Sequence, residues 1–176
     1  MKMDRQPVTS DILQYLEGQR EEMIRRLGSM VRVESPSDEP GTQHEIREII
    51  ATELEQLGFN VYRIPGRNNG GMLYASNPGR TRGLKAQLML GHYDTVWPLG
   101  TLENMPFEVE GDFIRGPGVY DMKGGIAQVL LALKTLHHFG IKPKVSPVIF
   151  LNSDEEIGSR ESGRYISALA PHMDRV

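Results

Sequence analysis

The sequence predicts an α/β fold, in which a mainly parallel sheet is flanked by helices. Segments whose apolar residues recur at helical spacing alternate along the chain with short, continuous apolar strands. This alternation is typical of parallel sheets that are covered by helices. The chain has 176 residues, and no internal repeat, low-complexity segment or interdomain linker divides it. We therefore expect a single domain.

Two helices are predicted in the first third of the chain. Ser10 is a candidate N-cap for a helix over residues 11–31, because apolar residues recur there at near-helical spacing with charged residues between them. Thr42 and Glu45 have the spacing of a capping box, which predicts the start of a second helix. Gly58 follows the last apolar position of that helix and is suited to end it.

Four strands, one hairpin and one further helix are predicted after these two helices. The hairpin is indicated by Glu110-Gly111-Asp112, a turn sequence between two short strands. The third helix covers residues 125–138, and Gly140 ends it. The strands are predicted over residues 59–63, 72–76, 84–90 and 147–151.

The amino-acid composition restricts the chemistry that the chain can perform. There are 20 Lys and Arg residues and 23 Asp and Glu residues, so the formal net charge is −3. This mild acidity argues against a nucleic-acid or anionic-membrane partner. The absence of cysteine excludes disulfides, cysteine-based zinc sites, iron–sulfur clusters and thiol nucleophiles. Any metal ion must therefore be held by His, Asp and Glu.

The distribution of apolar residues argues against a membrane protein. A membrane-spanning helix needs a run of roughly 18 apolar residues, and no run in the chain approaches that length. Residues 1–7 do not lead into the apolar segment of a secretory signal. We therefore expect a cytoplasmic location.

Residues that can bind a metal ion follow two of the predicted strands and precede the third helix. His92 and Asp94 follow one strand, Glu155 and Glu156 follow another, and Asp121 lies in a glycine-rich loop. In open parallel sheets, ligands gather at the carboxyl ends of the strands. We therefore expect these five side chains to lie at one edge of the sheet.

Each of these residues has a possible role at a metal centre. One imidazole and several carboxylates suit a zinc-like ion. Asp94 can accept a hydrogen bond from the ring of His92, because alternate residues of a strand face the same side. One carboxylate of the Glu155-Glu156 pair can bind metal while the other accepts a proton from water. An aspartate such as Asp121 can bridge two ions.

Other interpretations of the same residues remain open. A His-x-Asp pair can be purely structural, and acidic residues after a strand are common in solvated turns. The glycine-rich loop over residues 116–125 could belong to a nucleotide-binding α/β module. Neither G-x-G-x-x-G nor the P-loop pattern occurs there, which argues against that alternative.

Three segments in this order resemble a known family. They are Gly91-His92-Tyr93-Asp94-Thr95-Val96-Trp97-Pro98, the loop over residues 116–125, and Ser153-Asp154-Glu155-Glu156-Ile157-Gly158-Ser159. They look like the two-zinc metallopeptidase family that contains glutamate carboxypeptidase, acetylornithine deacetylase, succinyl-diaminopimelate desuccinylase and peptidase T. The residues of these segments are most similar to those of the glutamate carboxypeptidase branch. The resemblance covers most of the chain from about Leu84 onward.

The resemblance implies a zinc-dependent exopeptidase-like catalytic domain with two zinc ions, for which cobalt or manganese would also fit. His92 would bind one ion, Glu156 the other, and Asp121 would bridge both. Glu155 would be the general base, and Asp94 would orient His92. The family also carries a cis peptide after the bridging aspartate, which here is the bond between Asp121 and Met122.

The resemblance also implies that residues 1–176 are the N-terminal portion of an incomplete catalytic domain. A dimerisation or lid domain and a C-terminal catalytic segment would be absent, and the complete enzyme would be a homodimer. Each zinc ion would retain two protein ligands, whereas a catalytic zinc usually has three. We therefore expect these 176 residues alone to be inactive.

The function implied by the resemblance is metal-dependent amide hydrolysis. A glutamate-carboxypeptidase-like metallopeptidase would release a C-terminal amino acid by attack of a zinc-activated water. The alternatives are an N-acyl amino acid deacylase of the same family and a catalytically inactive truncated fragment. The expected partner is a small peptide or an N-acyl amino acid substrate, with no nucleic acid and no membrane.

Overall fold

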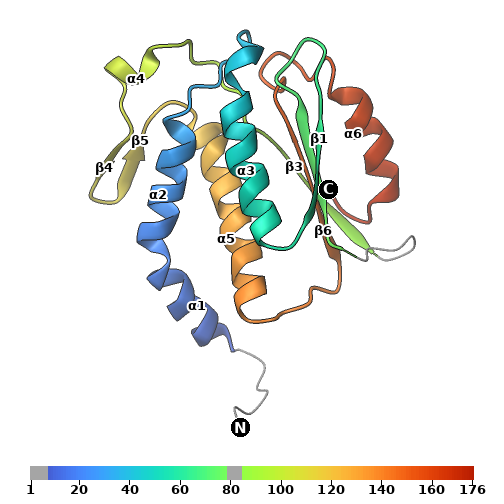
Figure 1. Cartoon of the computed structure of the whole chain (residues 1–176). Helices are drawn as coiled ribbons and strands as arrows, with labels where there is room; N and C mark the ends of the chain where they lie inside the picture. Colours follow the sequence, from blue (N-terminus) through green and yellow to red (C-terminus); the bar gives the residue numbers. More distant parts are fainter. Residues whose placement is uncertain (1–7, 79–84) are drawn as a thin grey trace.

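The computed structural model describes residues 8–78 and 85–176 (Figure 1). No helix in these two ranges is long and apolar enough to cross a membrane. The helices are α1 (Thr9–Gly18), α2 (Arg20–Val31), α3 (His44–Gln56), α4 (Thr101–Asn104), α5 (Gly124–His138) and α6 (Gly163–Leu169). The strands are β1 (Asn60–Ile64), β2 (Met72–Ser76), β3 (Ala86–His92), β4 (Glu108–Glu110), β5 (Phe113–Arg115) and β6 (Ser146–Asn152).

The central sheet has the strand order β1-β2-β6-β3. Strands β3 and β6 are parallel, whereas β1–β2 and β2–β6 are antiparallel. The predicted α/β class is confirmed, but the sheet is mixed, and the mainly parallel order holds only for β3 and β6. The reason lies in the connections. A short loop joins β1 to β2 and returns the chain antiparallel, whereas the long connection through α5 brings β6 parallel to β3.

Helices cover both faces of this sheet. In Figure 1, α2, α3 and α5 lie on one face and α6 lies on the other. Alternation along β6 explains this arrangement, because successive side chains point to opposite faces. Ile149 and Leu151 pack in the larger core with residues of α2, α3 and α5. Val148 and Phe150 pack in a smaller core with Tyr165 and other residues at the C-terminal end.

The first predicted helix is divided in two by the structure. Helix α1 ends at Gly18 and α2 begins at Arg20, with Gln19 between them. The bend lets α1 reach the end of α5, where the ring of Tyr15 stacks on that of His138 at 4.2 Å between centroids. The predicted N-cap, Ser10, lies inside α1, which begins after Val8.

The predicted capping box at Thr42 is wrong. Thr42 belongs to a short 3-10 helix, Pro40–Thr42, and its hydroxyl donates to the carbonyl of Glu39. Helix α3 begins only at His44, after Gln43. The Gln43 side chain is used elsewhere, because it donates to the Pro36 carbonyl and accepts the Gly70 N–H.

The other predicted elements occur with small shifts. Gly58 has φ +83° directly after α3, a conformation that favours glycine and ends the helix as predicted. The hairpin of β4 and β5 turns at Gly111 and Asp112. The strand predicted over 84–90 is β3, which begins at Ala86, and residue 84 lies outside the described residues. Helices α4 and α6 are too short to show a helical apolar period and were not predicted.

Candidate metal centre

The ends of two neighbouring strands position the candidate site. In the parallel pair, His92 at the end of β3 lies beside Asn152 at the end of β6. The segments that follow β3 and β6 leave the sheet at the same edge. The loop that carries Glu155 and Glu156 therefore passes close to His92. Asp121 comes from a kinked segment, Val119–Lys123, that leads directly into α5; its own backbone is extended, with φ −122° and ψ 105°.

A close contact explains why the loop before this segment contains glycine at position 118. Gly118 has φ +69°, and a Cβ atom there would lie 2.6 Å from the Thr95 methyl group. Only glycine fits this close approach without displacing the segment after β3. The loop therefore packs against the β3 end and brings Asp121 to His92.

His92, Asp121 and Glu156 offer ligand atoms that all lie within 4.8 Å of one another. Nε2 of His92 is 3.0 Å from Oδ1 of Asp121. The His92 ring is buried, whereas the Asp121 side chain is exposed and Glu156 is half-buried. The cluster therefore combines one buried imidazole with one exposed and one half-buried carboxylate. This donor set fits a metal ion such as zinc.

Asp94 lies on the other side of the His92 ring. Nδ1 of His92 is 3.1 Å from the Asp94 carbonyl and 3.3 Å from its carboxylate Oδ1. The same carboxylate, which is fully buried, accepts the backbone N–H groups of Glu155 and Glu156 at 3.3 and 3.2 Å. Asp94 thus ties the histidine to the loop that carries both glutamates.

Glu155 lies at the rim of the cluster. Its Oε2 is 3.9 Å from Nε2 of His92, and its side chain is 52% exposed. This position leaves the carboxylate free to meet a water molecule or a substrate.

The carboxylates around the cluster shift the pKa values of its members. Burial disfavours the charged form of His92, but Asp94, Asp121 and Glu155 outweigh it and raise the pKa of the imidazole to about 9. Burial raises the pKa of Glu156, and the nearby carboxylates of Asp121, Asp94 and Glu155 raise it further, against the opposing effect of His92. A cation placed in this cluster would relieve the repulsion among the carboxylates.

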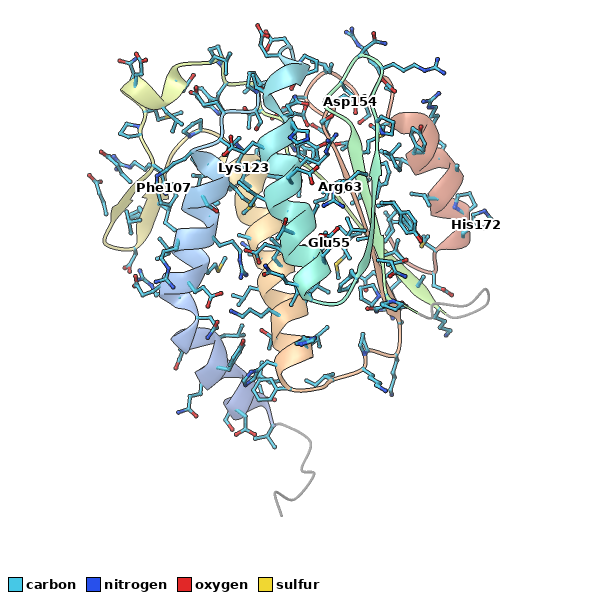
Figure 2. All side chains as sticks on the ribbon, in the orientation of Figure 1. Glu55, Arg63, Phe107, Lys123, Asp154 and His172 are labelled. Atoms are coloured by element: carbon cyan, nitrogen blue, oxygen red, sulfur yellow. The ribbon has the colours of Figure 1, made fainter. Side chains whose placement is uncertain are left out.

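The contacts that three residues make at or next to the site were missed by sequence reasoning. The hydroxyl of Ser37, a buried residue, donates to Oδ2 of Asp94 at 2.7 Å. The sulfur of Met122 accepts the backbone N–H of His92, and the Asp121–Met122 peptide is cis, as the family resemblance implies. Lys123 is buried beside α2 and donates to the Val33 carbonyl at 2.9 Å (Figure 2). Ser37 gave no signal, because a Ser-Pro-Ser sequence is also typical of an ordinary turn.

Solved structures share this fold. Human carnosine dipeptidase 1 aligns with 96% of this chain and 40% of its own, at 17% identity and a TM-score of 0.82. The M20 family metallo-carboxypeptidase Sso-CP2 from Sulfolobus solfataricus aligns with 87% of this chain and 35% of its own, at 22% identity and a TM-score of 0.72. These likenesses define the fold of the chain, an α/β domain that recurs in these larger proteins.

The sequence comparison identifies the family. The model of peptidase family M20/M25/M40 matches residues 88–176, which is more than half of the chain. The protein belongs to this family, and the resemblance found from the three motifs is confirmed.

Curated relatives cover most of this chain but extend well beyond it. Carboxypeptidase G2 from Pseudomonas sp. (strain RS-16) is 34% identical over 157 residues, which are 88% of this chain and 37% of the relative. The N-formyl-4-amino-5-aminomethyl-2-methylpyrimidine deformylase of Halalkalibacterium halodurans is 30% identical over 156 residues, 86% of this chain and 36% of the relative. The chain thus spans little more than a third of the length of these relatives.

Proposed function

We propose that this chain is the metal-binding part of a glutamate-carboxypeptidase-like amide hydrolase that releases the C-terminal amino acid of short peptides. The observation that carries the proposal is the cluster of His92, Asp121 and Glu156, with Glu155 at its rim, in a chain of the M20/M25/M40 family. The likeness to carboxypeptidase G2 supports the choice of a carboxypeptidase.

The donor set supports zinc as the metal, with His92 and Asp121 holding one ion and Asp121 and Glu156 a second. Zinc bound there would polarise the scissile carbonyl and make water acidic enough to be deprotonated near neutral pH. Cobalt and manganese accept the same nitrogen and oxygen ligands. With two protein ligands per ion from this chain, each ion needs a further ligand to reach the usual three.

The residues of this chain then divide the remaining work. Glu155 accepts a proton from the attacking water and later delivers it to the leaving amine, because its exposed carboxylate lies beside the cluster. Asp94 positions His92 through Nδ1, so that Nε2 faces the carboxylates. The positions of these groups support both roles.

Other relatives support a second candidate function. The relatives include a deformylase and three succinyl-diaminopimelate desuccinylases. These names favour an N-acyl amino acid deacylase, which would use the same residues on a different amide. The complete protein would act as a homodimer in either case.

Replacement of Glu155 by Gln tests the proposal. The longest form of the protein isolated from its natural source would be assayed with peptides ending in glutamate and with N-formyl and N-succinyl amino acids. We expect Glu155→Gln to bind zinc as the parent does but to lose hydrolysis, whereas Glu156→Gln loses zinc. Unchanged hydrolysis by Glu155→Gln would contradict the role of Glu155. Zinc binding without hydrolysis of any of these amides would favour the inactive alternative.

A further inference from the structure

A surface hollow lies beside the loop that carries Glu155 and Glu156. It has a volume of about 460 Å³ and lies between the β1–β2 loop and the segment that leads from β6 into α6. Figure 2 shows Asp154, one of its lining residues, near the end of the sheet where these two segments meet. A separate hollow lies at His92 and Asp121, and the two hollows share no lining residue.

Two acidic residues hold the walls of this hollow in place. Both carboxylate oxygens of Glu161 accept the backbone N–H of Arg67 at 3.0 Å, and one also accepts that of Asn68. Oδ2 of Asp154 accepts the backbone N–H groups of Glu161 and Ser162 at 2.7 and 3.1 Å. Both negative charges are thereby engaged by the backbone that forms the walls.

Two of the three arginines that line the hollow are much less engaged. In the described ranges, neither Arg67 nor Arg160 forms an ion pair, and both are exposed. The third, Arg164, is 3.6 Å from Oε1 of Glu161 and donates to the Tyr165 hydroxyl at 3.1 Å. The side chain of Asn69 also lines the hollow, but its Nδ2 is buried from solvent. The amide faces Asp154 closely enough to contribute to lowering the pKa of that carboxyl, against burial.

We propose that this hollow binds a small oxyanion, such as a carboxylate or a phosphate, through Arg67, Arg160 and Arg164. Guanidinium groups present parallel N–H donors that match the oxygens of both anions. The loop over residues 153–162 contributes Glu155 and Glu156 to the metal cluster and Arg160 to this hollow. An anion bound here contacts the same loop that carries the candidate base. The site stands on its own residues and does not depend on the proposed hydrolase activity.

Titration with glutarate, inorganic phosphate and chloride at equal ionic strength tests the site. The side-chain N–H signals of the three arginines and the ring signals of His92 would be followed by NMR in the full chain. We expect saturable chemical-shift changes with glutarate or phosphate and none with chloride. The anion that binds more tightly, glutarate or phosphate, identifies the kind of anion that the hollow prefers. Arg160→Gln removes a side chain that has no ion pair in the described ranges, so the fold is expected to be unchanged. It should weaken binding about fivefold, as loss of one exposed charge pair implies.

Arg115→Gln is the matched control, because Arg115 is an exposed arginine on β5 that lines no part of the hollow. Three results would overturn the proposal. They are shifts that rise linearly without saturation, equal weakening by Arg160→Gln and Arg115→Gln, and shifts confined to His92, which would place the anion in the metal cluster.

Discussion

Lys123 is a buried charge that the fold tolerates at a cost, and its replacement by Met should stabilise the protein at neutral pH. The side chain is 1% exposed, and its ammonium group donates to the Val33 carbonyl at 2.9 Å. Burial lowers its pKa from the ordinary value of 10.5 to about 8, although Glu34 opposes this. Met has a similar length and no charge, so it can fill the same space.

The size of the effect follows from the pKa. A difference of 10.5 − 8 = 2.5 between the unfolded and folded states corresponds to about 3 kcal/mol at pH 7, at ~1.4 kcal/mol for each pKa unit. Loss of the hydrogen bond to Val33 costs Lys123→Met about 1–2 kcal/mol. We therefore expect the variant to be more stable than the parent at pH 7 by about 1–2 kcal/mol.

The pH dependence gives a second, independent measure. Between pH 8 and 10.5 the unfolded lysine holds more protons than the folded one, so the parent gains stability as the pH rises through this range. The advantage of Lys123→Met should therefore shrink and disappear by about pH 10. Urea unfolding of both proteins at pH 7 and pH 10 measures the difference, in which titrations shared by the two proteins cancel.

Lys134→Met is the control on the same helix. Lys134 is partly exposed and pairs with Glu22, so its removal should lower stability at pH 7. The reasoning fails if Lys123→Met is less stable than the parent at pH 7, or if the difference between the two does not change with pH.

Two further predictions concern the metal cluster. Burial opposes the charged form of His92, but the surrounding carboxylates raise its pKa to about 9, so a metal must displace a proton at neutral pH. The apparent affinity for zinc should therefore rise about tenfold for each pH unit up to pH 9 and then level off, as measured by competition with a chelator; a flat profile would exclude His92 as a ligand. Ser37→Ala removes the hydroxyl that donates to Asp94, and should weaken zinc binding about tenfold or more through His92. Ser35→Ala, which removes a buried hydrogen bond to the Tyr93 carbonyl, should lower stability but leave zinc binding unchanged; equal losses in both variants would show that Ser37 is only structural.

Most of the candidate site could be recognised from the sequence, because its residues are consecutive or stand at strand ends. His92 and Asp94 share one triplet, Glu155 and Glu156 are adjacent, and the glycines before Asp121 mark a tight loop. The roles of the five residues stay proposals, but their proximity is visible in the structure. Ser37 could not be found in this way, because it reaches Asp94 from 57 residues earlier in the chain.

The sequence by itself determined the types of most elements and the family, since apolar periodicity and short motifs are local properties of the chain. Only the tertiary structure decided that the sheet is mixed, that Lys123 is buried, and that Arg67 and Arg160 line one hollow. The physical reason is that strand direction, burial and charge proximity depend on which distant segments pack together. The pairing of β2 with β6 brings the β1–β2 loop to the segment before α6, where Glu161 accepts the backbone N–H groups of Arg67 and Asn68 from more than 90 residues earlier in the chain.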